Sequence, residues 1–371
     1  TIVQSSNTSA SAISITGTGG ALGVSHGISF RGASTKIYSK GASGGLTVTG
    51  NSPSWSSTVY SDVELLSASG AIQWLNSDST SGVYGANKPI AIGSKAGVAG
   101  LSTSSSNVTL NFKRFEGVPA FAIGTTGQVN IQGVGGTASF SSSLTSGLFG
   151  LNANGHVMSG FSFGSPSNTA TLSISQALAV NGAVTIYGGN IAVNGALTAT
   201  GNINLHATGA VSQSAAMAAT GLGLHGTGAF TLTNTGNSVS TLAGGSSASK
   251  LGSLSYVNAG ALTIGTVNPT GITASGTVSI STQTGNLTIA EAITTTNTGS
   301  SAISLNAGRS ATPGTGAGGE IIKNAAVTAG AGGRIIYYMG TPAGSAAAAG
   351  LVTSGQGQVR FNADETTNFA S

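Results

Sequence analysis

The stretch that decides the fold runs from Val184 to Leu205 and reads VTIYGGNIAVNGALTATGNINL. Apolar residues stand two apart in it, as in Val-Thr-Ile at 184–186 and Ile-Asn-Leu at 203–205. This alternation puts both apolar side chains of a run on one face of a β-strand. Gly, Asn or Thr-Gly separates each run from the next, which indicates turns. We therefore expect strands of about three to five residues, too short for a fold of free-standing hairpins.

The same pattern recurs along the chain. Ala-Val-Asn-Gly-Ala occurs at 179–183 and 192–196, and Gly-Ala-Gly-Gly followed by a charged residue and Ile occurs at 316–321 and 330–335. This spacing predicts two or three strands per coil and coils of roughly 20 to 28 residues. Successive coils would pair their backbones and stack their apolar side chains into a narrow core. The sequence thus predicts an all-β fold, a right-handed parallel β-helix (β-solenoid), with the hand that parallel crossovers favour.

Composition excludes several other classes of protein. The 371 residues include 60 glycines and 7 prolines, but no triplet period, so the chain is not a collagen. Charged residues make up only 5%, whereas disordered chains carry many charges and few apolar residues. No apolar run is long enough for a membrane-spanning helix. Cysteine is absent, which rules out disulfides and thiolate metal ligands.

The distribution of charge favours stacked coils. Residues 117–249 contain no Asp, Glu, Lys or Arg. Equivalent positions in successive coils lie about 4.8 Å apart, where two like charges repel by about 1 kcal/mol even in water. Neutral Ser, Thr and Asn avoid this repulsion and can hydrogen-bond along the stack. The net charge of +4 rests on twelve scattered cations, so we expect no nucleic-acid partner.

Three regions differ in regularity. We interpret residues 1–116 as irregular β-helix coils with longer loops, since they hold both tryptophans and half of the charges. Residues 117–311 are predicted to be regular β-helix repeats, uncharged as far as Ser249. Residues 312–371 are predicted to be terminal coils.

Parallel β-helices also include polysaccharide-cleaving enzymes, which need clustered carboxylates. Only eight acidic residues exist here. Asp62 and Glu64 would share a strand face, with Asp78 a coil later, and we interpret them as solvated polar positions. His206 and His225 lie near one coil length apart and would stack, but two histidines are too few for a metal site. We therefore expect no catalytic residue, no metal and no cofactor.

Two sets of residues are candidates for contacts with partners. Four aromatic residues would either form a platform for cell-surface glycans or fill the core of wide coils, as large aromatic side chains usually do. Four apolar residues are candidates for end-to-end assembly, because a terminal coil exposes unpaired strand edges. The aromatic set is Trp55, Tyr60, Trp74 and Tyr84, and the assembly set is Ile2, Val3, Ile13 and Ile15.

Several stretches, taken in order, resemble a known group of repeats. They are IYGGNI at 186–191, GALTATGNINL at 195–205, ALTIGTV at 261–267, GTVSIS at 276–281, GGRIIYY at 332–338 and VRFNADETT at 359–367. Together they resemble the repeat arrays of large filamentous-haemagglutinin-like exoproteins. The resemblance implies a secreted β-helix at a Gram-negative cell surface, with an outer-membrane anchor or export partner and a role in adhesion or biofilm matrix. We also interpret the ending, Asp364 to Ser371, as a cut within a longer precursor.

One feature departs from that group. Members exported by two-partner secretion begin with a domain that carries Asn-Pro-Asn-type motifs, whereas the single Asn-Pro here is Asn268-Pro269, in the middle of the array. We expect a non-enzymatic extracellular structural protein, a surface fibre or adhesin stalk. It would act as a monomeric stalk or polymerise with itself, end to end or laterally. The alternatives are a polysaccharide-binding or polysaccharide-cleaving β-helix and, ranked last, an ice- or surface-binding solenoid.

Overall fold

The computed structural model divides the chain into two compact units, Thr1–Gly189 and Asn190–Ser371. The boundary between the units falls inside the predicted regular region. Within the described residues the regular structure is almost entirely β-strand, and a 3-10 turn at Ala153–Gly155 is the one helical element. The structure describes residues 2–9, 12–18, 26–31, 34–41, 43–51, 55–59, 62–76, 82–85, 89–112, 115–116, 120–133, 142–144, 148–312, 318–340 and 357–361.

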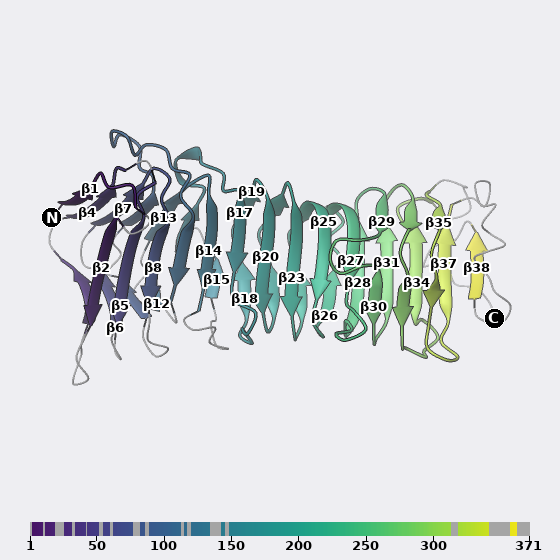
Figure 1. Cartoon of the computed structure of the whole chain (residues 1–371). Coiled ribbons are helices and arrows are strands. Elements are labelled where there is room, and N and C mark those ends of the chain that lie inside the picture. Colours follow the sequence, from purple (N-terminus) through teal and green to yellow (C-terminus); the bar gives the residue numbers. More distant parts are fainter. Residues whose placement is uncertain are drawn as a thin grey trace. The chain divides into compact units, whose positions relative to one another are not determined.

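The first unit is a stack of coils with three strands each (Figure 1). Its first coil contains β1 (Ile2–Ser5), β2 (Ile13–Thr18) and β3 (His26–Phe30), and each of these pairs in parallel with the strand three places later. The sheets therefore run through successive coils. The other strands are β4 (Ser34–Ser39), β5 (Leu46–Asn51), β6 (Trp55–Val59), β7 (Asp62–Ser67), β8 (Ile72–Asn76), β9 (Gly82–Gly85), β10 (Pro89–Gly93), β11 (Val108–Asn111), β12 (Phe115–Glu116), β13 (Ala120–Gly124), β14 (Gln128–Gln132), β15 (Ser142–Leu144), β16 (Phe149–Leu151), β17 (Gly160–Phe163), β18 (Leu172–Ile174), β19 (Leu178–Val180) and β20 (Ala183–Gly188).

The second unit repeats the same plan. A coil consists of strands such as β21 (Ile191–Val193), β22 (Leu197–Ala199) and β23 (Asn202–Ala207), and in two coils the last two strands merge into one. The merged strands are β25 (Met217–His225) and β27 (Ser238–Gly244). The others are β24 (Val211–Gln213), β26 (Ala229–Leu232), β28 (Ser253–Asn258), β29 (Leu262–Ile264), β30 (Ile272–Ala274), β31 (Val278–Thr282), β32 (Leu287–Ile289), β33 (Ile293–Thr295), β34 (Ile303–Ala307), β35 (Ile321–Lys323), β36 (Val327–Thr328), β37 (Ile335–Met339) and β38 (Gly357–Phe361).

These pairings confirm the predicted parallel β-helix. The two alternating runs quoted from the deciding stretch, 184–186 and 203–205, lie in β20 and β23. The coil length varies more than predicted. Ile203 pairs with Leu222, 19 residues later, whereas Ile72 pairs with Val108, 36 residues later. The difference arises at the corners, because loops of unequal length leave the stack there.

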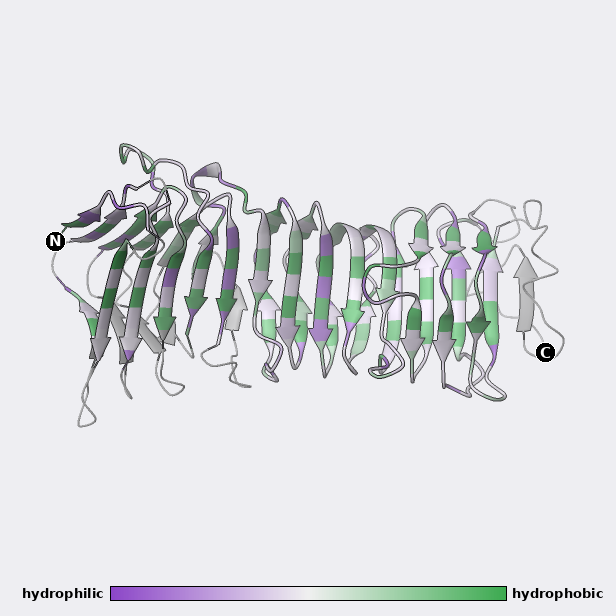
Figure 2. Cartoon of the chain, in the orientation of Figure 1, coloured by the Kyte–Doolittle hydropathy of each residue, from purple (hydrophilic) through white to green (hydrophobic). Residues whose placement is uncertain are grey.

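The core of each unit consists of columns of apolar side chains at equivalent positions of successive coils. Alternate residues of a strand point inward, and Figure 2 shows the resulting bands of hydrophobic and hydrophilic residues. One column of the first unit contains Val48, Trp74, Leu110, Ile131, Phe163 and Ile186. One column of the second unit contains Ile203, Leu222, Leu242, Ile264 and Ile289, and every member of both columns is fully buried.

Several rows of outward positions carry neutral polar residues in register. In the first unit one such row is Ser14, Thr47, Gln73, Thr109, Asn130, Ser162 and Thr185. In the second unit Thr263 pairs with Thr288, and Thr273 with Thr294. These threonines are irregularly spaced along the sequence, but the coil register aligns them into short columns. Neutral side chains tolerate this spacing, whereas like charges would repel.

Buried asparagines stabilise the corners of the second unit. The Asn237 side chain is fully buried, and its Nδ2 donates to the carbonyls of Leu232 and Val257 at 3.2 and 3.1 Å. Its Oδ1 accepts from the Met217 backbone N–H at 2.9 Å. Asn258 bonds to both backbone groups of Val239 in the same way. These amides supply hydrogen-bond partners where the strands turn and the backbone ladder is interrupted.

Candidate functional site

The aromatic set does not gather into one described platform. Trp74 lies fully buried on β8, where its ring meets the edges of Phe30, Phe112 and Phe121 at centroid distances of 5.6, 5.7 and 6.1 Å. It therefore fills the core and offers no surface to a glycan. Trp55 lies on β6 and Tyr84 on β9, which pair in parallel. The side chains of those two residues, and Tyr60 altogether, lie outside the described residues.

The assembly set is divided between surface and core. Ile2 and Val3 on β1 are 65% and 38% exposed. Ile13 on β2 is 7% exposed and belongs to the core, while Ile15 is half-buried. Ile2 and Val3 are therefore the most accessible of the four to another molecule, and Ile13 is not accessible.

The carboxylate of Glu64 is buried, contrary to the expectation of a solvated position. Glu64 is 6% exposed on the outward face of β7, while Asp62, two residues earlier, is exposed. Lys95 Nζ lies 2.6 Å from Glu64 Oε1, and the Tyr38 hydroxyl donates to Glu64 Oε2. Burial alone would raise the pKa of Glu64. The hydrogen bonds from Lys95 and Tyr38 and the charges of Lys95 and Lys36 outweigh it and hold that pKa below its usual value.

A loop explains why Glu64 is covered. Residues 94–107, which we call the cover loop, connect β10 to β11 and lie over the outward faces of β4 and β7. Leu101 of this loop is fully buried against Tyr38 and Leu66, with Val98 beside it. The Lys95–Glu64 pair thus ties the loop to the sheet. An acid engaged in this way is not poised to protonate a glycosidic oxygen, and Asp78 lies outside the described residues.

His206 and His225 stack as the sequence predicts. They are register partners on β23 and β25, their ring centroids are 4.0 Å apart, and their planes differ by 6°. Burial lowers the pKa of His206 to about 4, and the neighbouring His225 lowers it further in the same sense. Burial also lowers the pKa of His225, against a hydrogen bond to the backbone of Asn268. Parallel rings do not converge on a common point, so the pair is not arranged to chelate a metal.

A short strap packs beside the histidines. Residues 265–271 leave the stack between β29 and β30 and lie against the outward face of β25, where Gly221 and Gly223 make room. A Cβ on Gly221 would lie 3.0 Å from Val267, and one on Gly223 would lie 2.9 Å from the Asn268 carbonyl oxygen. The Asn268–Pro269 peptide bond within the strap is cis. The sequence signal that could have located this packing is the Gly-Leu-Gly run at 221–223.

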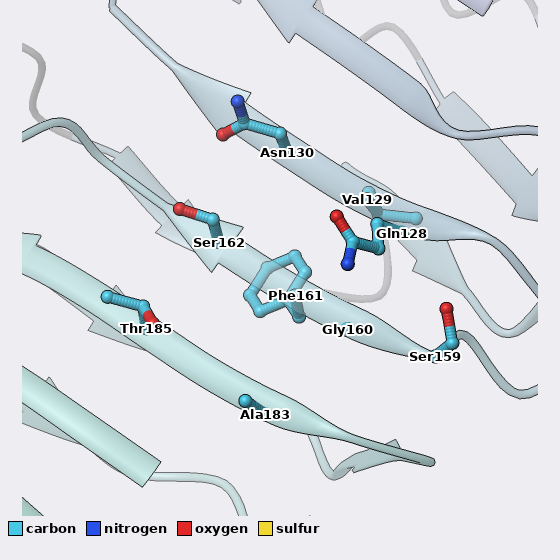
Figure 3. A pocket seen from close by; sticks show the side chains of 9 residues that line it. All are labelled: Gln128, Val129, Asn130, Ser159, Gly160, Phe161, Ser162, Ala183 and Thr185. Carbon is cyan, nitrogen blue, oxygen red and sulfur yellow. The ribbon is translucent and has the colours of Figure 1, made fainter. Parts of the chain in front are cut away.

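A trough of about 270 Å³ runs over the outward face of β14, β17 and β20 in the first unit. Its rows follow the coil register: Gln128, Gly160 and Ala183 form one, and Asn130, Ser162 and Thr185 form the next. Figure 3 shows bare backbone at Gly160 beside the Gln128 side chain. Every side chain that lines the trough is uncharged.

An amide in this trough is not satisfied. Asn130 Oδ1 is buried and has no hydrogen-bond partner among the described residues, while its Nδ2 lies 3.5 Å from Gln132 Oε1. A buried acceptor without a donor costs about 1–3 kcal/mol. Such a cost is relieved when water or a ligand hydroxyl supplies the donor. Sequence reasoning missed this trough, because one glycine among 60 carries no signal until its register partners are known.

Comparison with known protein families, with curated proteins and with solved structures gives no match to this chain. Among the described residues, no three His, Asp or Glu side chains gather in a group that could hold a metal ion. The described part of the chain also has no helix that is long and apolar enough to cross a membrane.

Proposed function

We propose that this chain is a non-enzymatic structural segment of an extracellular protein, a surface fibre or adhesin stalk built from stacked β-coils. The observation that carries the proposal is the repeated core column, in which Ile203, Leu222, Leu242, Ile264 and Ile289 occupy one place in successive coils. In such a solenoid each coil contacts its neighbours alone, and stability is spread along the axis. Such a stack can be lengthened coil by coil, as a fibre or stalk requires.

The neutral outward rows support the same proposal. They let the coil be repeated many times without accumulating like charges at a spacing of about 4.8 Å. The order of the repeats also supports membership of the filamentous-haemagglutinin-like exoproteins, with a secreted or cell-surface location and an outer-membrane export partner. Within that proposal, contact with surface glycans or with other copies of the chain is the adhesive function.

Labelling of intact cells tests the location. Cells that produce the protein are treated with a membrane-impermeant amine reagent, which reaches exposed lysines such as Lys40. We expect the protein to be labelled before lysis, while a cytoplasmic marker protein in the same cells is not. Labelling that appears only after lysis would refute an extracellular role.

A second measurement tests the mechanical role. The second unit is held between two handles and stretched in a single-molecule force experiment. We expect coils to detach in steps at a force well above that of a helical bundle of similar size, because each step breaks a whole ladder of backbone hydrogen bonds. Extension without a force plateau would argue against a load-bearing stalk.

A further inference from the structure

We infer that the trough over β14, β17 and β20 is a binding site for a neutral sugar chain. The inference goes beyond a structural role and rests on the shape of the trough, on its chemistry and on an unsatisfied amide. Each of these is a property of the first unit alone.

The open shape of the trough is due to the absence of a side chain at Gly160, although the backbone conformation there does not require a glycine. Its φ is not positive, and a Cβ there would meet nothing closer than Gln128 Cγ at 3.3 Å and the Ala183 carbonyl oxygen at 3.7 Å. By contrast, a Cβ on Gly182 would clash with the Ser159 carbonyl oxygen. Gly160 is the first residue of β17, and a glycine in a strand often marks a bulge, a bend, or a place where a ligand or another backbone approaches closely. Gly160 therefore keeps the floor of the trough open.

The walls of the trough display amides and hydroxyls. Gln128 and Asn130 stand on β14, Ser162 lies on the floor, and Thr185 stands on β20 (Figure 3). Tyr187 is not one of the lining residues, but it follows Thr185 by two residues, so its half-buried ring lies on the same face of β20, farther along the strand. Side-chain amides both donate and accept hydrogen bonds, as vicinal sugar hydroxyls do. An aromatic ring with a polar tip suits the alternating apolar and polar surface of a sugar.

The unsatisfied amide favours a hydroxylated ligand. Asn130 Oδ1 has no donor among the described residues, and the half-buried Asn130 side chain is one of those that line the trough. A sugar hydroxyl would supply the missing donor and would leave the rest of the amide free to bond to Gln132.

Other ligand classes fit less well. Residues 117–249 contain no charged side chain, so the trough has no counter-charge for phosphate, sulfate or an acidic peptide. A peptide that adds a strand needs a free sheet edge, whereas β17 is paired on both sides, with β14 and with β20. A lipid chain needs an apolar lining, and the exposed walls here are polar.

The test measures binding of the full chain to a panel of neutral hexasaccharides containing hexose, N-acetylhexosamine or deoxyhexose units, by titration calorimetry. Sulfated hexasaccharides and a neutral hexapeptide complete the panel. We expect at least one neutral sugar to bind, with affinity lowered at least tenfold by Gly160→Thr, which fills the trough, and several-fold by Asn130→Ala. Ala192→Thr is the control, since it also places a threonine at an outward, half-buried position, here on β21, and it should leave the affinity unchanged.

Thermal unfolding checks that each variant is folded, and Asn130→Ala carries the test if Gly160→Thr is not. The inference is overturned if no neutral sugar binds, if only sulfated sugars or the peptide bind, or if both trough variants bind as the wild type does. Sugar binding is measured on the purified protein and does not depend on where the protein resides. The sugar site can therefore be refuted while the extracellular role stands, and the extracellular role can be refuted while the sugar site stands.

Discussion

The imidazole rings of His206 and His225 face each other at 4.0 Å on adjacent strands of the second unit. Both are half-buried, and burial lowers the pKa of each. The outward residues around them on β23, β25 and β27 are Asn202, Asn204, Gly221, Gly223, Thr241 and Ala243, none of which is charged. Two protonated rings at this distance would repel without a counter-charge, so the stack is a neutral pair.

The second unit should lose stability as the pH falls from 6.5 toward about 4. Between these pH values the two histidines bind protons in the unfolded chain but not in the folded chain, so protonation favours unfolding. Above pH 6.5 the histidines are neutral in both states, and stability does not depend on them. We expect a loss of about 1–3 kcal/mol in the free energy of unfolding, measured by chemical denaturation at pH 7, 5.5 and 4. The double variant His206→Asn with His225→Asn should lose less over this range. Equal pH dependence in both proteins would contradict the prediction.

Replacing Trp74 should destabilise the first unit strongly. Its ring is fully buried among Phe30, Phe112 and Phe121, so Trp74→Ala leaves a large cavity. Substitutions of this kind cost about 3–5 kcal/mol, which is measured by chemical denaturation followed by circular dichroism. Thr47→Ala, at an outward position of the neighbouring strand, should cost less than about 0.5 kcal/mol. A Trp74→Ala variant as stable as this control would show that the ring is not in the core.

The Lys95–Glu64 pair should show strong coupling. Lys95→Met leaves the buried carboxylate without its cation, and a loss of about 1–3 kcal/mol is expected, discounted because the Lys95 side chain is 48% exposed. The pKa of Glu64 should then rise, since burial is no longer opposed by Lys95. The double variant Lys95→Met with Glu64→Gln should recover part of the loss, and a double-mutant cycle measures the coupling. Additive effects would mean that the two groups do not interact.

Charges placed in adjacent coils should interact through the register. Thr263 and Thr288 are partners on β29 and β32, and both are half-buried. Thr263→Lys or Thr288→Lys alone should be tolerated better than the two together, with an extra penalty of about 1 kcal/mol from like-charge repulsion. Thr263→Lys with Thr288→Glu should lack this penalty. Denaturation at low and high salt measures the difference, and equal stability of the two double variants would contradict the register.

Most of the fold can be predicted from local sequence patterns. The alternating runs locate the strands because an apolar side chain every second residue is enough to define an inward face. The spacing of His206 and His225 indicates their stacking because the coil between them contains no long loop. Coil lengths are harder to predict, since a loop such as residues 94–107 adds length to a coil without changing its strands.

The sites that depend on long loops escape sequence reasoning. Glu64 meets Lys95 across 31 residues, and the local sequence around Glu64 indicates only a solvated position because the cover loop is distant in the chain. Similarly, the Gly-Leu-Gly run at 221–223 marks a place with room on the outward face, but it does not indicate that the strap, about 45 residues later, is the segment that packs there. The trough at Gly160 is formed by three strands in register, so it can be recognised only when the residues beside Gly160 on the two neighbouring strands are known.

The shared register of Ile203, Leu222 and Leu242 also bears on how such a gene can change. A segment that begins and ends at equivalent positions can be deleted or duplicated, and the coils brought together then still meet through the same column of buried apolar side chains. Unequal recombination between the DNA repeats that encode neighbouring turns would then yield a foldable product. The length of such a protein can thus change in increments of whole coils.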